Sequence, residues 1–193
     1  MNEQIYAQIE SLQSDIAKKR KEILALRAQA APEPVADYTL HDREGRAVKL
    51  SDLFDDRDEL LVIHNMGEAC KYCTLWADGL TGFTRAMSDR VPFVLISPDE
   101  PAVQKEFADS RGWNFDMLSA AGTSFIADMG FYKEKEGYYP GVSALFRKDG
   151  QIYRASYDFF GPGDNYASIW HFFDLLPKRV NGWQPKYEYP PRK

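Results

Sequence analysis

Two cysteines, Cys70 and Cys73, stand three positions apart and are the only cysteines of the chain. They follow an apolar run that ends at His64 and a loop that contains Gly67, and they open a segment with helical spacing. Thiol-disulfide exchange needs a thiolate, which the unpaired N–H groups and the positive dipole end of a helix start favour. We therefore expect a redox dithiol in which Cys70 is the nucleophile and Cys73, one helical turn later, is the resolving cysteine.

The residues beside the motif act on the pKa of Cys70 in opposite directions. Lys71 favours the thiolate and Glu68 disfavours it, so the sequence leaves the direction of the shift open. Two other interpretations of the pair are weaker: two small buried hydrophobes on a helix face, or half of a structural zinc site. The remaining soft or borderline metal donors are three scattered histidines: His41, His64 and His171. They do not form a second paired motif, so we predict no metal and no cofactor.

Five residues near the motif are candidates for lining the site: His64, Lys71, Tyr72, Trp76 and Asp78. Trp76 falls a turn below the dithiol, where it either walls the site or, as we favour, fills the core. Asp78 is either a proton acceptor for the resolving thiol or a structural acid. His64 ends the central strand, where ligands of open α/β sheets gather, although a lone strand-end histidine is more often structural.

The composition favours one folded domain with an appendage. The chain has 193 residues, 44% hydrophobic and 14% aromatic, which is enough for a full core and argues against disorder. Its net charge of −5 gives no electrostatic reason to expect nucleic acid or an anionic membrane as a partner. The basic run Lys18–Lys21 is best explained as the solvated face of a helix.

The first residues lack the basic and apolar regions of a signal peptide, and no apolar run is long enough to span a bilayer. We therefore expect a cytoplasmic protein without a membrane partner. In a reducing cytosol a lone Cys-x-x-Cys pair is more plausibly a cycling dithiol than a permanent crosslink. Its partners would be a cellular reductant and an unidentified protein or small-molecule disulfide or thiol.

Residues 2–29 are predicted to form a long amphipathic helix. Its apolar positions recur at alternating steps of four and three: Ile9, Leu12, Ile16, Ile23 and Leu26. Lys19 fills the one gap, and the stripe is as narrow as a coiled-coil seam. The helix therefore either mediates a homodimer or lies along its own domain. The prolines of residues 30–34 end it and form a short, stiff linker.

The elements that must position the motif alternate along the chain. Before the motif we expect a hairpin from 37–40 and 46–50, a helical turn at 51–54 and a strand that ends at His64. The motif helix should run to about Asp89 and be followed by a strand at 93–97, a helix around 102–107 and a short strand at 117–119. A hairpin from 142–147 and 151–155 and a helix at 165–176 complete the domain. Parallel strands joined by helices are buried on both faces, so the predicted class is α/β. The proline-rich tail should be irregular and lie against the body.

The second half of the chain is dense in aromatic residues. Most should be core, and a minority lining a groove beside the dithiol would select an apolar or aromatic substrate. The set is Phe125, Phe131, Tyr132, Tyr138, Tyr139, Tyr157, Phe159, Phe160 and Trp170.

Several motifs together resemble one known family: Leu53–Asp58, the pair Cys70 and Cys73, Trp76–Gly79, Arg111–Trp113, Pro140–Ser143 and Asp174–Lys178. Through them the chain is similar to the thioredoxin-like family catalogued as domain of unknown function 899, also labelled a dithiol-disulfide oxidoreductase family. The lead-in at 37–40 and 48–54 resembles the redoxin and peroxiredoxin branch. The resemblance implies a thioredoxin-like domain at 35–178, with a peroxiredoxin-like mixed sheet and helices on both faces, between the helix at 1–31 and an irregular tail at 179–193.

Two positions depart from the related families. Thioredoxins carry a cis-proline beside the active disulfide, where this chain has Ser143, a further candidate for lining the site. Peroxiredoxins place a threonine three residues before the peroxide-attacking cysteine and a proline further upstream, whereas this chain has Gly67 and no nearby proline. The first departure argues against thioredoxin-style docking of a substrate, and the second argues against a peroxidase.

The residues favour a thiol-disulfide oxidoreductase whose substrate the sequence does not name. One alternative is a thiol peroxidase, in which Cys70 becomes a sulfenic acid that Cys73 captures as a disulfide. Another alternative is a non-catalytic binding module, in which the dithiol is inert and the N-terminal helix and the aromatic groove bind the partner.

Overall fold

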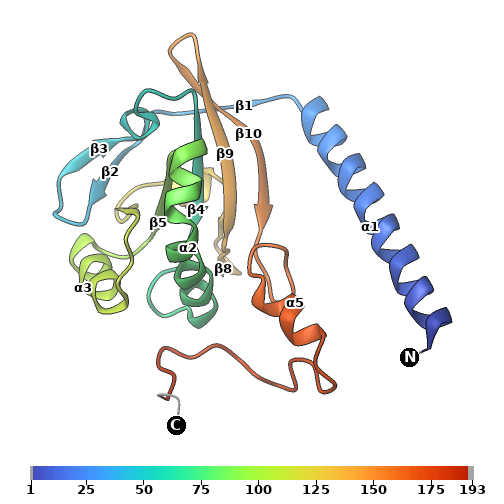
Figure 1. Cartoon of the computed structure of the whole chain (residues 1–193). Helices are drawn as coiled ribbons and strands as arrows, with labels where there is room; N and C mark the ends of the chain where they lie inside the picture. Colours follow the sequence, from blue (N-terminus) through green and yellow to red (C-terminus); the bar gives the residue numbers. More distant parts are fainter. Residues whose placement is uncertain (1, 191–193) are drawn as a thin grey trace.

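The computed structural model describes residues 2–190. Its centre is an eight-stranded sheet, around which the helices are arranged (Figure 1). In spatial order the strands are β1 (Glu33–Val35), β10 (Gln151–Phe159), β9 (Gly141–Lys148), β4 (Glu59–His64), β5 (Phe93–Ser97), β6 (Asp116–Ser119), β2 (Thr39–Asp42) and β3 (Ala47–Lys49). The three strands β4, β5 and β6 are parallel, and the other pairings are antiparallel.

The remaining elements surround this sheet or stand beside it. The helices are α1 (Glu3–Gln29), the 3₁₀ turn η1 (Leu50–Phe54), α2 (Lys71–Arg90), α3 (Pro101–Arg111), α4 (Phe125–Asp128) and α5 (Ile169–Asp174). A separate two-stranded ribbon is formed by β7 (Tyr132–Lys133) and β8 (Gly137–Tyr138). The predicted α/β class is confirmed, and the Cys-x-x-Cys motif lies at the start of α2, after the loop that follows β4.

Two clusters of buried side chains cover the two faces of the sheet. Leu60 and Val62 of β4 join the cluster under η1 and α4. Ile63 joins the second cluster, with Ala77 of α2 and Ala108 of α3. Successive strand side chains point to opposite faces, and a central parallel strand is buried on both. This explains why the β4 segment is a continuous apolar run that ends where the redox motif begins.

The hairpin of β9 and β10 matches the prediction because its turn chemistry is unambiguous. Lys148 pairs with Gln151, so Asp149 and Gly150 form a two-residue loop. Their φ angles are 51° and 78°, the left-handed conformation that both central residues of a type I′ turn require. Aspartate followed by glycine accepts this conformation, and the register of the hairpin is fixed as a result.

Two predicted segments differ from the structure. The stretch taken as a linker contains β1, where Pro34 lies on the edge strand of the sheet and its missing N–H is tolerated. The last helix is only Ile169–Asp174, because Asp164 Oδ1 accepts the N–H groups of Tyr166 and Ala167 and delays the helix start. The short elements α4, β7 and β8 were not predicted.

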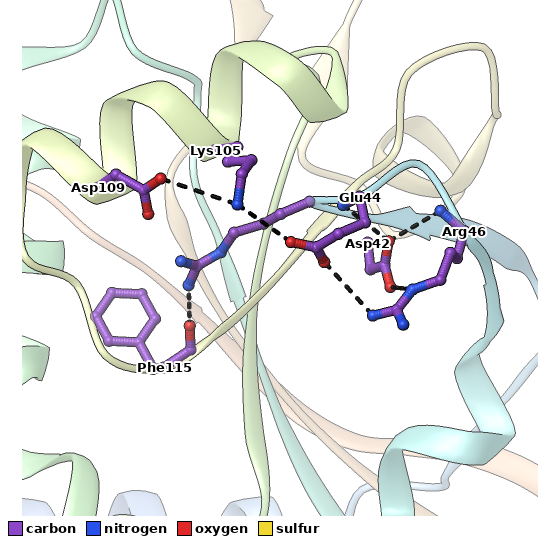
Figure 2. Close-up of polar contacts among 7 residues, drawn as sticks. Asp42, Glu44, Arg46, Lys105, Asp109 and Phe115 are labelled. Carbon is purple, nitrogen blue, oxygen red and sulfur yellow. Dashed lines mark hydrogen bonds and ion pairs between the residues drawn. The ribbon is translucent and has the colours of Figure 1, made fainter.

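A surface network fixes the β2–β3 turn against α3 (Figure 2). Asp42 accepts the backbone N–H groups of Glu44 and Arg46 at 3.0 and 2.9 Å and binds Arg46 Nε at 2.6 Å. Glu44 then reaches Lys105 Nζ of α3 at 3.2 Å. Exposed pairs of this kind contribute about 0–1 kcal/mol each, so the network adds little to the stability of the fold. The orientation of α3 matters because its last residue, Arg111, reaches the site.

Candidate active site

Cys70 occupies the N-cap position of α2, and its Sγ accepts a hydrogen bond from the backbone N–H of Cys73 at 3.1 Å. Its carbonyl oxygen accepts the N–H of Thr74 at 3.0 Å, so the helix begins directly at the motif. Cys70 is half-buried, whereas Cys73 is buried in the first turn. Of the two thiols, Cys70 is therefore the one that a substrate can reach.

The two thiols differ in acidity because they share a hydrogen bond. The thiol of Cys73 donates to Cys70 and, together with the N–H groups of Cys73 and Tyr72, lowers the pKa of Cys70 to about 7 against the effect of burial. The same hydrogen bond, burial and the charge on Cys70 raise the pKa of Cys73. The pKa of Cys70 is therefore shifted downward and that of Cys73 upward, which favours the negative charge on Cys70; the hydrogen bonds of Cys73 and Tyr72, and not the charges of Lys71 or Glu68, cause the shift at Cys70.

The loop between β4 and α2 is held by side chains from two strands. Asn65 Oδ1 accepts the N–H of Gly67 at 2.8 Å, and Asp99 Oδ2 accepts the N–H of Glu68 at 3.0 Å. Gly67 has a φ of +101°, and a Cβ atom there would lie 2.5 Å from Asp99 Oδ1. The carbonyl oxygen of Gly67 in turn accepts the N–H of Cys70 at 3.1 Å. Glycine at 67 therefore fixes the approach of the chain to the reactive cysteine.

A shallow pocket of about 520 Å³ opens beside Cys70. It is also lined by Met66, Ala69, Lys71, Tyr72, Glu136 and Tyr138. Two predicted site residues, Lys71 and Tyr72, thus lie at the reactive thiol. The other side of the pocket comes from the β7–β8 ribbon, which supplies an aromatic ring and a carboxylate. A substrate that enters here meets both apolar and charged groups.

The C-terminal tail reaches the same end of α2. Arg111 Nη1 donates to the carbonyl oxygen of Tyr187 at 2.8 Å, and Lys71 Nζ lies 5.6 Å from the centre of the Tyr187 ring. Burial and the nearby charges of Cys70 and Glu68 raise the pKa of Tyr187. Residues 179–190 of the tail contain no helix or strand, and they bring a phenol close to the dithiol, whereas residues 191–193 lie outside the described part of the chain.

Asp78 is a structural acid that joins α2 to α3. Its Oδ1 accepts from Arg111 Nε at 2.8 Å and from Trp113 Nε1 at 2.9 Å, and its Oδ2 accepts from Arg111 Nη2 at 2.5 Å. These three contacts hold the carboxylate against Arg111 and Trp113, and no hydrogen bond joins it to Cys73, so they favour the structural role over that of a proton acceptor for Cys73. Through Arg111, Asp78 instead supports the backbone of the tail at Tyr187.

Replacing Asp78 by alanine should lower the free energy of unfolding by about 1–3 kcal/mol, because Arg111 and Trp113 would lose their acceptor. Arg111 would also hold the tail less firmly, so amide hydrogen exchange around Tyr187 should become faster. Urea denaturation and hydrogen exchange measure the two effects.

The matched control is Arg90→Ala, which removes an exposed ion pair between α2 and Glu59, 2.7 Å long. We expect it to change the free energy of unfolding by no more than about 1 kcal/mol and to leave exchange in the tail unchanged. Equal effects of Asp78→Ala and Arg90→Ala would contradict the structural role of Asp78.

His64 and Ser143 bind each other on the sheet face opposite α2. His64 Nε2 and Ser143 Oγ are 2.9 Å apart, both residues are buried, and the imidazole stacks on Phe131 with ring centres 3.6 Å apart. Burial and the charge of Arg154 lower the pKa of His64 to about 3, so the imidazole is neutral near pH 7. Neither residue lines the pocket beside Cys70, and residues 2–190 contain no cis peptide bond.

Trp76 is buried, in agreement with its predicted place in the core. Its ring lies between Tyr72 and Phe160, with centre distances of 6.3 and 5.3 Å. It also lines an apolar groove of about 410 Å³ with Leu80, Phe83, Val142, Ala144 and Phe160, among others. Cys70 does not line this groove, and Trp76 does not line the pocket beside Cys70.

Sequence reasoning missed the roles of Asp99, Glu136 and Tyr187. Asp99 had a usable signal, since it follows a buried parallel strand and such strand ends meet at ligand sites. Glu136 and Tyr187 lie in irregular segments, where no periodicity reveals which way the chain folds back.

Within residues 2–190, no group of three or more His, Cys, Asp or Glu side chains is arranged to hold a metal ion. Of the helices described, none has both the length and the apolar character that crossing a membrane requires.

The sequence matches, over residues 6–189, the family described as bacterial protein of unknown function (DUF899). No curated protein matches it. Among solved structures, the fold is similar to that of peroxidoxin BcpB from Mycobacterium tuberculosis, with a TM-score of 0.58 and 21% identity over 71% of this chain and 88% of that chain.

Two other solved structures support the same architecture. A cysteine-to-serine variant of PrxQ from Xylella fastidiosa has a TM-score of 0.61 and 11% identity over 72% of this chain and 91% of that chain. A hypothetical protein from Sinorhizobium meliloti has a TM-score of 0.53 and 17% identity over 82% of this chain and 88% of that chain. The predicted thioredoxin-like fold of the peroxiredoxin type is thereby confirmed.

Proposed function

This chain belongs to the bacterial family of unknown function DUF899, and we propose that it is a thiol-disulfide oxidoreductase with Cys70 as nucleophile and Cys73 as resolving cysteine. The observation that carries the proposal is the hydrogen-bonded pair at the start of α2, in which Cys70 is reachable and its pKa is lowered to about 7. A thiol with a pKa near ambient pH combines a large thiolate fraction with good nucleophilicity.

In the first step the Cys70 thiolate attacks one sulfur of a substrate disulfide. A mixed disulfide forms, and the other substrate sulfur leaves as a thiolate that takes a proton from water. Cys70 no longer carries a charge at this stage, so one of the causes that raise the pKa of Cys73 disappears. Cys73 can then lose its proton and become a nucleophile.

In the second step Cys73 attacks Cys70 Sγ, and the second substrate sulfur leaves as a thiolate. The products are the Cys70–Cys73 disulfide and two substrate thiols, so the substrate is reduced by two electrons. A cellular dithiol returns the pair to its reduced form by the same exchange. We expect this cycle in the cytoplasm, where reductants keep such dithiols reduced.

A second candidate function is a thiol peroxidase, which the similarity of the fold to peroxiredoxin structures favours. Cys70 would attack a peroxide oxygen, giving a sulfenic acid and an alcohol or water, and Cys73 would condense with the sulfenic acid to release water. Gly67 counts against it, because a glycine offers no side-chain donor to the peroxide three residues before Cys70.

The two candidates are separated by mixing the reduced full chain with oxidised glutathione and, separately, with hydrogen peroxide. Rapid quenching and intact mass measurement follow the Cys70–Cys73 disulfide. We expect the chain to react with oxidised glutathione faster than free cysteine does. Its reaction with hydrogen peroxide should be no faster than that of free cysteine with hydrogen peroxide. The opposite pattern would establish the peroxidase, and a pair that forms no reversible disulfide with either oxidant would contradict both.

A further inference from the structure

The long helix α1 has no buried residue in the single chain, although large apolar side chains run along it. Leu12 and Ile16 are 63% and 68% exposed. Figure 1 shows the helix standing away from the sheet, and Arg27 in its last turn pairs with Asp158 of β10 at 2.8 Å. A lone helix with an exposed apolar seam is marginal in water, so a second surface must cover it.

The seam repeats every seven residues, which identifies the kind of surface that fits it. The seven positions of each repeat are labelled a to g, with Ile9 at position a. Position a is then occupied by Ile9, Ile16 and Ile23, and position d by Ile5, Leu12, Lys19 and Leu26. In parallel coiled coils, isoleucine at a with leucine at d favours two strands over three or four. Lys19 is the one charged residue in the seam, and its Nζ lies 2.8 Å from Glu22 in an exposed ion pair.

The flanking charges fit one orientation of a second α1. Asp15 and Glu22 occupy g positions, and Arg20 and Arg27 occupy e positions. In a parallel pair, each g residue faces the e residue five positions later on the other helix, so Asp15 meets Arg20 and Glu22 meets Arg27, whose guanidinium also binds Asp158 of its own chain. An antiparallel pair would place acid beside acid and base beside base. In the single chain Asp15 holds only the exposed Lys18, so its carboxylate can turn to a partner.

We propose that α1 forms a parallel two-stranded coiled coil with α1 of a second copy of this chain. Both copies then project their sheets from the same end of the coil, since α1 ends at Gln29 and β1 begins at Glu33. The contact needs nothing from the dithiol, so it stands independently of the proposed redox function.

The first test measures, by light scattering, the mass of the unmodified full chain, of its Ile16→Glu variant and of the control variant Ala17→Glu. We expect a dimer at micromolar concentration, and a dissociation constant raised on the order of 100-fold or more by a charge at position a but not at the adjacent position b. Because α1 buries nothing in its own domain, both variants should keep the Cys70 alkylation rate. A monomer at tens of micromolar would overturn the proposal.

The second test determines orientation in the full chain carrying Cys70→Ser and Cys73→Ser. Leu12→Cys at a d position should give a disulfide-linked dimer on oxidation, since like d positions meet across a parallel seam. Ser14→Cys, on the outer face, should remain uncrosslinked. A dimer that fails to crosslink at position 12 would contradict the parallel coil and point to docking of α1 in the apolar groove beside Trp76 or to an antiparallel pair.

The third test uses charge. Asp15→Arg and Arg20→Asp should each weaken self-association by at least about 3-fold, because each places like charges at g and e. Mixing the two variants should restore a dimer of unlike chains, since both cross-helix pairs become attractive again. Dissociation constants that are unchanged in the single variants, or a mixture that associates no better than they do, would overturn the proposed g–e pairing.

Discussion

Replacing Cys70 by serine should reduce the rate of disulfide exchange on the order of 10³-fold or more, because the chain has one other cysteine and it is buried. The exchange rate is measured as the rate at which oxidised glutathione is converted to reduced glutathione, while an added reductant returns the Cys70–Cys73 pair to its reduced form. The fold should persist, since serine also accepts the N-cap hydrogen bond from the N–H of residue 73.

The matched variant is Cys73→Ser, which should keep the first attack and lose the second. We expect a stable mixed disulfide between Cys70 and glutathione, visible in the intact mass, and a turnover as low as that of Cys70→Ser. If the mixed disulfide formed on Cys73 in the Cys70→Ser chain instead, the assigned order of the two cysteines would be wrong.

Replacing Gly67 by alanine should lower the free energy of unfolding by about 1–3 kcal/mol and slow the alkylation of Cys70. The new Cβ would lie 2.5 Å from Asp99 Oδ1, in a backbone with a φ of +101° that alanine disfavours. Asp99 cannot move without releasing the N–H of Glu68, so the loop that leads to Cys70 must shift.

Gly79→Ala is the control for this loop, because Gly79 lies in the interior of α2 with nothing within 4 Å of its added Cβ. It should raise the free energy of unfolding by about 0.5–1 kcal/mol and leave Cys70 alkylation unchanged. Urea denaturation and alkylation kinetics measure both variants. A neutral Gly67→Ala would show that Asp99 does not hold the loop as described.

The parts of the fold that could be predicted are those with a strong local signal. The apolar run that forms β5 is bounded by prolines on both sides, and its limits agree with the prediction. The final helix is shorter than predicted because Asp164 delays its start, and its apolar residues have unlike environments, since Trp170 is buried and Phe172 is 65% exposed. Periodicity reports that a helix has an apolar side, and it does not report whether another element covers that side.

The site shows the same division between local and long-range information. The position of Cys70 at the N-cap follows from spacing alone. Lys71 and Tyr72 line the same pocket because they follow Cys70 directly in the sequence. The hydrogen bond between the thiols, which decides the pKa of Cys70, depends on how the first turn of α2 is packed. Ser143 was placed by resemblance to a cis-proline position, but its hydroxyl binds His64 instead.

The most direct test of the account is the rate of alkylation at each cysteine as a function of pH, with the modified site assigned by mass spectrometry. A lowered pKa means that the thiolate forms earlier as pH rises, so the rate at Cys70 should reach half its maximum at a pH of about 7 and level off above it. Cys73, whose pKa is raised, should stay unreactive over the same range. A half-maximum for Cys70 at or above the ordinary value of about 8.5 would contradict the assignment of Cys70 as an activated nucleophile.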